Sequence, residues 1–264
     1  MTKTILITGA TDGIGLATTR MLLSQGHKVL LHGRNPKKLA TVAASLSDYS
    51  DNIELFEADL SRLAEVSNLD GQISQKHRTL DVLINNAGVL KTTDTVTRDG
   101  LDARFAVNTI APYLLTKQLL PLLGTSGRVV NVSSAAQAPV DLDGLMGRKK
   151  YADAMSAYAQ SKLAIIMWTR ALTAQLGENG PVIVAVNPGS LLASKMVQQG
   201  FGVAGSDLNI GAKILVRAGL SDEFSHASGK YFDNDAGRFS DPHPDALSSD
   251  KIENVMQAIE QLLP

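Results

Sequence analysis

Short apolar runs alternate with longer stretches of helical periodicity along the whole chain. Several short runs, such as Lys28–Gly33 and Val182–Asn187, are apolar at nearly every position, which is typical of strands covered on both faces. Strands that alternate with helices in this way predict βαβ units and a parallel sheet. We expect seven strands, at Lys3–Thr8, Lys28–Gly33, Ile53–Ala58, Leu80–Asn85, Arg128–Ser133, Val182–Asn187 and Gly229–Phe232.

The segments between these runs have the spacing of helices. We expect helices at Gly15–Gln25, Pro36–Leu46, Leu63–His77, Leu101–Leu123, Ala154–Gly177, Asn209–Ala218 and Ser249–Leu263. No repeat, low-complexity tract or linker divides the chain. We therefore predict that residues 1–264 form one α/β domain with a Rossmann fold, a doubly wound seven-stranded parallel sheet with helices on both faces.

Three connections are longer than such a domain requires: residues 89–100, 135–153 and 190–208. Each follows a predicted strand, so each leaves the carboxyl edge of the sheet, where open α/β sheets bind ligands. We interpret the three loops as walls of a substrate site, with the glycine-containing third loop as a mobile lid. The alternative is that the three loops are surface loops without a role in binding.

Composition narrows the possible function. With 25 basic and 26 acidic residues the formal net charge is −1, which is unlike the basic footprint of a nucleic-acid-binding protein. The chain has no cysteine, and its histidines lack ligand spacing, so we expect no metal site. No apolar run approaches the ~18 residues of a membrane span, and no targeting segment is visible. We expect a cytoplasmic protein without a membrane span or nucleic-acid partner.

A glycine-rich turn follows the first predicted strand and opens a helix, with Gly9, Gly13 and Gly15 in the spacing G-x-x-x-G-x-G. Glycines at this position let backbone N–H groups approach a pyrophosphate at the helix N-terminus. Glycines also occur in ordinary turns, so they do not by themselves indicate a nucleotide site. Their placement between a strand and a helix predicts a dinucleotide site.

The second predicted strand ends at Gly33 and is followed by Arg34, where an acidic residue would normally hold a free ribose 2′-hydroxyl. An arginine there accommodates a 2′-phosphate, so the sequence favours NADP as cofactor, with NAD as the alternative. Asp12, inside the glycine-rich loop, argues against added phosphate charge. Arg34 as a solvated surface charge is the other interpretation.

Tyr158 and Lys162 are four residues apart on a predicted helix and so lie on one face. A phenol has a pKa near 10, and a fall of ~3 units, worth about 4 kcal/mol, would let it exchange protons near neutral pH. A nearby ammonium favours the phenolate. Alone, such a pair is more often a surface pair than a catalytic one.

Together, several motifs resemble the short-chain dehydrogenase/reductase superfamily in order and placement, from Ile5 to about Phe232. They are Thr8-Gly9-x-x-x-Gly13-x-Gly15, Asn85-Asn86-Ala87-Gly88, Asn108, Ser134, Tyr158-x-x-x-Lys162 and Pro188-Gly189. Three further stretches are most similar to its retinol-dehydrogenase-like branch: Asn131-Val132-Ser133-Ser134, Ser161-Lys162-Leu163-Ala164 and Gly229-Lys230-Tyr231-Phe232.

The resemblance implies a catalytic tetrad. Tyr158 would be the general acid/base, and Lys162 would lower its pKa and hold the nicotinamide ribose. Ser134 would bind the substrate oxygen, and Asn108 would support a water relay to Lys162. Ser134 is chosen over Ser133 because it matches the family's serine at the end of this strand. The predicted cofactor contacts are Gly9, Thr11, Asp12, Gly13, Ile14, Gly15, Arg34, Asp59, Leu60, Asn86, Ala87, Gly88, Tyr158, Lys162, Pro188, Gly189 and Leu191.

Two departures from the family pattern stand out. The gap from Ser134 to Tyr158 is longer than in most members, the retinol-dehydrogenase-like ones excepted. The usual threonine after Pro188-Gly189 is displaced or replaced, with Ala193 and Ser194 near its place. The second departure puts one phosphate or carboxamide contact in doubt.

These features predict an NADP-dependent oxidoreductase that interconverts a carbonyl and an alcohol on a small molecule. Retinoid, steroid, quinone, sugar and small ketone all stay open, and the resemblance to the retinol-dehydrogenase-like branch favours a lipophilic substrate only slightly. The strongly apolar helices at 101–123 and 154–177 suggest a homodimer or homotetramer. The alternatives are an NAD-dependent alcohol dehydrogenase, a dehydratase or epimerase on the same fold, and a nucleotide-binding redox sensor without turnover. The identity of the substrate stays open.

Overall fold

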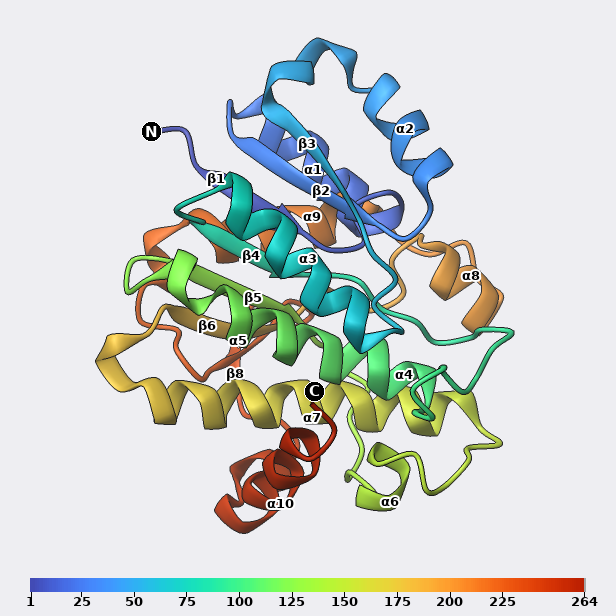
Figure 1. The fold of residues 1–264 in the computed structure, drawn as a ribbon. Coiled ribbons are helices and arrows are strands. Elements are labelled where there is room, and N and C mark those ends of the chain that lie inside the picture. The colour runs from blue at the N-terminus through green and yellow to red at the C-terminus, as the bar shows by residue number, and fades with distance from the viewer. Residues whose placement is uncertain (264) are drawn as a thin grey trace.

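A single sheet of eight strands runs through the computed structural model, which describes residues 1–263 (Figure 1). In chain order the strands are β1 (Thr4–Ile7), β2 (Lys28–Gly33), β3 (Ile53–Glu57), β4 (Val82–Asn85), β5 (Arg128–Val132), β6 (Val182–Asn187), β7 (Tyr231–Asp233) and β8 (Arg238–Ser240). Their spatial order is β3-β2-β1-β4-β5-β6-β7-β8. The strand order reverses between β1 and β4, which opens a crevice at the carboxyl edge.

The prediction of a doubly wound parallel sheet is confirmed, with one difference in strand number. The first seven strands pair in parallel, whereas β8 pairs antiparallel with β7, from Tyr231 opposite Ser240 to Asp233 opposite Arg238. This eighth strand was not predicted because three residues bounded by turns carry no readable hydrophobic period. It extends the sheet by one strand beyond β7 and forms its edge.

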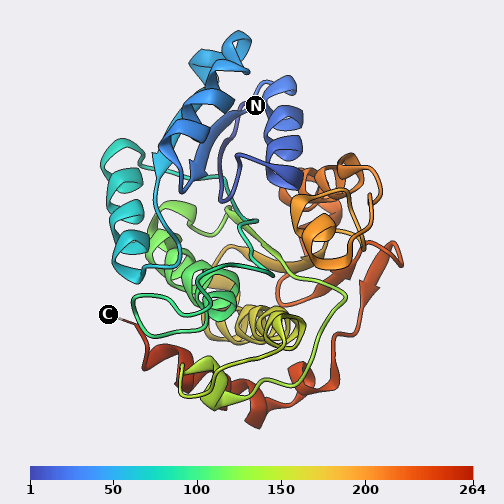
Figure 2. The same cartoon turned by 90° about the vertical axis from the view of Figure 1, so that its right-hand side faces the viewer.

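Helices cover both faces of the sheet (Figure 2). One face carries α1 (Gly13–Ser24), α2 (Pro36–Ala44) and α9 (Leu208–Leu220), and the other carries α3 (Leu63–Lys76), α5 (Ala111–Leu123) and α7 (Ala154–Leu176). Successive strand residues point to opposite faces, so Leu6 enters one apolar core while Ile5 and Ile7 enter the other. Within residues 1–263, no helix has the length and apolar character needed to cross a bilayer.

The helix predicted at Leu101–Leu123 is divided by a π-helical turn. It consists of α4 (Ala103–Phe105), the π turn at Ala106–Ile110 and then α5. Single π turns inserted into helices are frequent at functional sites, because they displace the side chains that follow. Here the turn contains Asn108, one member of the predicted tetrad.

Two short helices lie inside segments that were predicted to be loops. They are α6 (Leu142–Leu145), capped by Asp141, and α8 (Lys195–Phe201), capped by Ser194. Each begins with an N-cap side chain that accepts backbone N–H groups, the usual start of a helix. Both are too short for a hydrophobic period to be read from the sequence.

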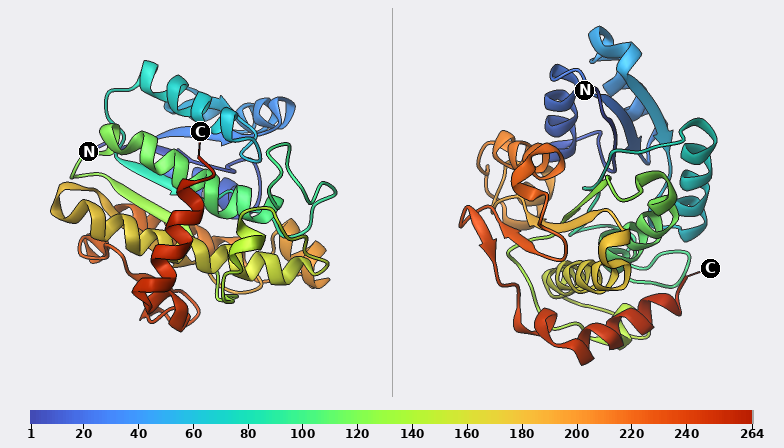
Figure 3. Two further views of the ribbon diagram at one scale, coloured as in Figure 1. Left: turned by 60° about the horizontal axis from the view of Figure 1, so that its bottom comes forward. Right: turned by 90° about the vertical axis from the view of Figure 1, so that its left-hand side faces the viewer.

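The C-terminal helix α10 (Ser249–Glu260) crosses the outer side of α7 (Figure 3). It buries Val255 and Ile259 in the same core as Trp168 of α7. The Glu260 carboxylate accepts hydrogen bonds from the Tyr113 hydroxyl and from Lys117 Nζ, both on α5. The chain's own α10 therefore covers apolar surface that suggested a subunit interface, and the homo-oligomer stays a prediction.

The ends of β1, β2 and β3 are tied together by one buried imidazole. His32 Nδ1 accepts a hydrogen bond from Gly9 N at 3.2 Å, and its Nε2 donates to Ala58 O at 3.0 Å. Only the neutral ring with its proton on Nε2 can make both bonds. Burial lowers the pKa of His32 to about 4, so the ring remains neutral through the physiological range.

This burial predicts a specific loss of stability in acid. Since His32 has an ordinary pKa near 6.5 when unfolded, the unfolded chain takes up a proton between about pH 6.5 and pH 4 that the native chain excludes. Stability should fall as the pH drops through this window, by about 3 kcal/mol from this residue. Urea unfolding from pH 7 to pH 4 should show that His32→Asn lacks this component, because the asparagine side chain does not titrate. The exposed control His226→Asn should keep it. Parallel pH profiles for wild type and His32→Asn would contradict the assignment.

Candidate active site

The first strand–helix turn lies against the end of β4 with no room for side chains. A Cβ on Gly9 would lie 2.9 Å from Ala87 Cα, and one on Gly15 would lie 2.3 Å from Gly9 O. Gly9 also has φ +64°, a conformation that favours glycine. Asn86 Nδ2 donates to Thr8 O at 2.9 Å and to Gly9 O at 3.1 Å, which fastens the turn to β4. The glycines therefore serve a close backbone approach and leave the N-terminus of α1 open.

A cavity of about 500 Å³ extends along the carboxyl edge of the sheet from this turn to α7. Apart from Leu191, every residue predicted to contact the cofactor lines it. The cavity is also lined by residues that were not named as cofactor contacts. Several of them lie in the loops predicted as site walls: Val89, Leu90, Lys91, Leu192, Ser194, Lys195, Met196 and Val197. The others are His32, Gly33, Lys38, Ala58, Val107, Val132, Ser133 and Asn187. Of the predicted loops, 89–100 and 190–208 contribute walls, whereas 135–153 contributes no lining residue within the described chain.

Leu191 is one prediction that the structure does not place at the cavity. Its φ is +50°, and its side chain is 47% exposed. The next residue, Leu192, is buried and lines the cavity instead. The left-handed backbone at Leu191 turns its side chain outward, and no sequence signal marks that conformation at a leucine.

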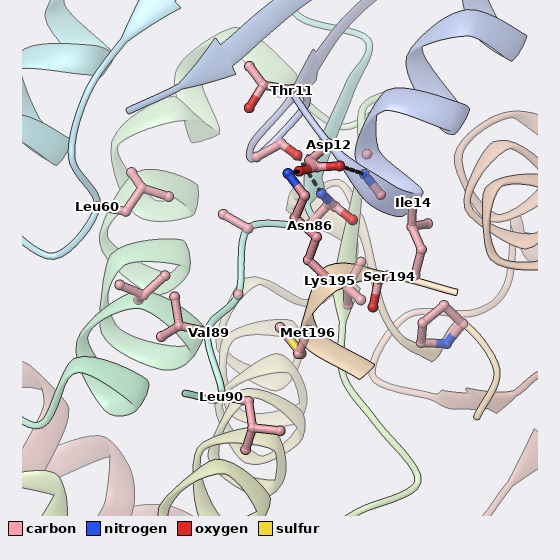
Figure 4. A pocket seen from close by; sticks show the side chains of 18 of the residues that line it. Thr11, Asp12, Ile14, Leu60, Asn86, Val89, Leu90, Ser194, Lys195 and Met196 are labelled. Atoms are coloured by element: carbon pink, nitrogen blue, oxygen red, sulfur yellow. Dashed lines mark hydrogen bonds and ion pairs between the residues drawn. The ribbon is translucent and has the colours of Figure 1, made fainter. Parts of the chain in front are cut away.

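One end of the cavity carries an exposed arginine and a carboxylate held between two lysines. Arg34 lines this end, and Asp12 accepts from Lys38 Nζ at 2.7 Å and Lys195 Nζ at 2.9 Å (Figure 4). Burial alone would raise the pKa of Asp12, but the hydrogen bonds from both lysines and from Gly13 N outweigh it and lower the pKa to about 2. The charge of Asp12 is therefore already matched by two cations, which removes the sequence-based objection to a phosphate at this end.

At the other end, Tyr158 and Lys162 share one face of α7. Lys162 Nζ lies 5.6 Å from the centroid of the Tyr158 ring and donates to Val132 O at 2.7 Å. Burial lowers the pKa of Lys162 to about 7. Burial also raises the pKa of Tyr158, while a hydrogen bond with the Ser134 side chain acts in the opposite direction. The arrangement holds a protonated phenol beside an ammonium that titrates near neutral pH.

The two adjacent serines at the end of β5 have different partners. Ser133 is buried, and its hydroxyl donates to Lys162 O at 2.8 Å. The Ser134 hydroxyl accepts from Ala136 N at 3.1 Å and lies within hydrogen-bonding reach of Tyr158. This geometry supports the choice of Ser134 as the serine that meets the substrate.

Asn108 lies behind the cavity and does not line it. Its Oδ1 accepts from Val89 N at 2.8 Å, and its Nδ2 donates to Val89 O and to Ser161 Oγ, each at 3.0 Å. The side chain thus fixes the backbone of a cavity wall and the helix that carries Tyr158. Its role in a water relay stays a prediction.

Helix α8 lies over the middle of the cavity. Ser194, at its start, lies 3.6 Å from the position of a Cβ on Gly13, and Met196 Cε lies 3.7 Å from the position of a Cβ on Gly88. Met196, Val89 and Leu90 form an apolar group away from Asp12 and Thr11 (Figure 4). The lid predicted in the third loop is therefore partly helical, and Lys195 joins it to the glycine-rich turn.

Comparisons with known proteins identify the family of this chain. The sequence profile of the short chain dehydrogenase family matches residues 3–202. Human retinol dehydrogenase 13 is 30% identical over 253 residues, which cover 88% of this chain and 76% of that protein. Mouse retinol dehydrogenase 12 is 32% identical over 244 residues, 87% of this chain and 77% of that protein.

Solved structures show the same likeness. The NADPH-bound carbonyl reductase from chicken fatty liver superposes with a TM-score of 0.71 at 25% identity, covering 90% of this chain and 98% of that one. The crystal structure of a landomycin C-6 ketoreductase with bound NADP and rabelomycin gives 0.68 at 26%, covering 88% and 94%. By fold, motifs and relatives, the chain belongs to the short-chain dehydrogenase/reductase superfamily of oxidoreductases, in its retinol-dehydrogenase-like branch.

Proposed function

We propose that this protein is an NADP-dependent oxidoreductase that interconverts a carbonyl and an alcohol, with Tyr158 as the general acid/base. One observation carries the proposal: a single cavity joins the glycine-rich turn and Arg34 at one end to Ser134, Tyr158 and Lys162 at the other. The open N-terminus of α1 suits a pyrophosphate, and the cavity is large enough for an elongated ligand. The residues present therefore fit a nicotinamide dinucleotide.

Each residue at the catalytic end has a defined task in this proposal. A bound nicotinamide supplies the hydride for reduction and accepts it for oxidation. In reduction, the Ser134 hydroxyl donates a hydrogen bond to the substrate oxygen, and the Tyr158 hydroxyl delivers the proton to the same oxygen. Lys162, in its ammonium form, stabilises the phenolate that Tyr158 becomes. Because burial keeps Tyr158 protonated beforehand, the chain is prepared to act as the acid.

The preference for NADP is supported by charge at the opposite end. Arg34 is exposed at the cavity, and Lys38 lies beside it on α2. A guanidinium offers paired donors that match a phosphate. The chicken carbonyl reductase and the landomycin ketoreductase, both similar to this chain, bind NADPH and NADP respectively.

The substrate proposed is a small lipophilic carbonyl compound or alcohol. Val89, Leu90, Val107, Met196 and Val197 give the cavity an apolar section beyond the phosphate end. Such a surface binds apolar groups by excluding water and offers few polar partners to a sugar. Residues 89–100 and 190–208 would select the substrate within one domain spanning residues 1–264. Homo-oligomerisation and a cytoplasmic location remain expectations from the sequence.

Removing the Tyr158 hydroxyl should slow turnover strongly and leave cofactor binding intact. For Tyr158→Phe we expect a fall in kcat of about 10³-fold, the usual scale of general acid catalysis. NADPH oxidation followed by absorbance, across aldehydes, ketones and quinones, measures kcat, and fluorescence titration measures the NADPH Kd. Tyr49→Phe, at a tyrosine outside the cavity lining, is the control and should match wild type. Equal activity of Tyr158→Phe and wild type would disprove the mechanism. NADPH binding without turnover of any tested substrate would favour the redox sensor.

Reversing the charge at Arg34 should change the cofactor preference. For Arg34→Asp we expect the Kd for NADPH to rise about 100-fold, because a paired phosphate contact is replaced by repulsion. The Kd for NADH should change little. Lys37→Asp is the matched control: it makes the same kind of charge reversal three residues away, at a position outside the cavity lining. Unchanged NADPH affinity in Arg34→Asp would instead support the NAD-dependent alternative.

A further inference from the structure

The turn after β7 lies against the segment that follows β6. Asp235 Oδ1 accepts from Ser190 N at 2.8 Å, and Asp235 Oδ2 accepts from Ser190 Oγ at 2.5 Å and from Asn187 Nδ2 at 2.9 Å. Asp233 Oδ1 accepts a second bond from Asn187 Nδ2 at 2.8 Å. Asn234 Nδ2 donates to Pro188 O at 2.9 Å. Three successive residues of one turn thus hold every residue from Asn187 to Ser190 except Gly189.

The held segment has a backbone that needs support. Gly189 has φ +120° and Leu191 has φ +50°, and the second value is unfavourable for a residue with a side chain. Strained backbone of this kind persists only where surrounding contacts hold it in place. Asn187, Pro188 and Gly189 line the cavity at the end that also contains Tyr158 and Lys162. The contacts from the turn therefore act on a wall of the catalytic end.

The Asp235 carboxylate is the centre of this contact. It accepts three hydrogen bonds although its side chain is exposed. Burial of its inner part acts to raise the pKa of Asp235, but the bonds from Ser190 and Asn187 lower it overall. The group is therefore ionised at neutral pH, and charge-assisted bonds of this type are stronger than neutral ones.

Strand β7 and the segment after β8 also contact the backbone of Ser134. The Tyr231 hydroxyl, on β7, donates to Ser134 O at 3.2 Å. Gln137 Nε2 donates to the same carbonyl oxygen at 3.1 Å, and Gln137 Oε1 accepts from His243 N, after β8, at 2.8 Å. The β7–β8 unit thus reaches both the Pro188–Ser190 backbone and the Ser134 backbone.

We propose that Asp235 is a positioning residue, and that the turn Asp233–Asp235 clamps residues 187–190 in the conformation that receives the nicotinamide end of the cofactor. This inference rests on the proposed function. Asp235 itself is not a catalytic residue, because it reaches the cavity only through Ser190 and Asn187. The clamp acts on one end of the cavity and leaves the adenosine end, formed by β1, β2 and β3, unchanged.

Amide hydrogen exchange in the cofactor-free protein tests the clamp without reference to activity. In Asp235→Ala we expect the Ser190 amide, observed by NMR, to exchange at least about tenfold faster, as the loss of one charge-assisted bond implies. Asp235→Asn keeps an acceptor for Ser190 N and should lie between the two. Asp241→Ala, an exposed carboxylate after β8, is the control and should match wild type. Unchanged exchange at Ser190 in Asp235→Ala would overturn the proposal.

Binding of a cofactor and of its fragment then separates the two ends of the cavity. For Asp235→Ala, calorimetry should show about tenfold weaker NADPH binding, with unchanged binding of adenosine 2′,5′-bisphosphate, which lacks the nicotinamide. Equal weakening of both ligands would overturn the proposal, because it would indicate a general loss of structure. Unchanged NADPH affinity would overturn it as well.

A different result would disprove the proposed function. If the wild-type protein bound neither NADPH nor the bisphosphate, the NADP site itself would be disproved, and with it the nicotinamide role of the clamp. Exchange at Ser190 would still decide whether Asp235 orders the segment. As a further readout, NADPH deuterated at one of the two C4 positions can be followed during turnover. The fraction of deuterium transferred to the product should become mixed in Asp235→Ala and should match wild type in Asp241→Ala.

Discussion

The backbone of the first strand–helix turn lies so close to the end of β4 that hydrogen atoms alone fit at Gly9 and Gly15. The Asn86 amide spans the gap and bonds to the carbonyl oxygens of Thr8 and Gly9. Since β1 and β4 are the parallel strands between which the strand order reverses, this contact sets the floor of the crevice. This contact positions the N-terminus of α1 and the backbone from Ala87 to Val89. Asn108 links that backbone to α7, because its side chain bonds to Val89 N and to Ser161 Oγ.

The two ends of the cavity use charge in opposite ways. At the glycine-rich end, Asp12 is compensated by Lys38 and Lys195, so cations are in excess and an anionic ligand gains by binding. At the catalytic end, Lys162 makes no ion pair within residues 1–263 and donates to a backbone carbonyl group instead. An ammonium buried without a counter-charge is destabilised, and in the proposed reaction it would therefore gain most from the negative charge that forms on Tyr158. One end favours a charge that the ligand brings, and the other favours a charge that forms during the reaction.

The sequence predicts most of this structure where information is local. The bounds of β2 and β6 are the ones predicted from the sequence, because each continuous apolar run stops at a polar or glycine residue. The π turn around Asn108 uses the same residue types as an ordinary helix, so its extra backbone step leaves no pattern. Apart from Leu191, the cofactor contacts expected from the motifs all line one cavity. The side chain of Leu191 lies outside it, because its left-handed backbone turns it outward, and nothing in the sequence marks that conformation at a leucine. The contacts of Asp12 with Lys195, and of Asp235 with Ser190, join distant segments and become visible only in the folded chain.

The covering of α7 by α10 has a consequence for biosynthesis. Trp168 and its apolar neighbours on α7 are translated well before Val255 and Ile259, which complete the core around them. While residues 177–248 are being added, the helix that carries Tyr158 and Lys162 exposes an apolar side to solvent or to a chaperone. The face of the sheet that carries α1 is completed earlier, because its last helix, α9, ends at Leu220, before α10 begins. The half that contains α7 becomes fully packed only when α10 leaves the ribosome.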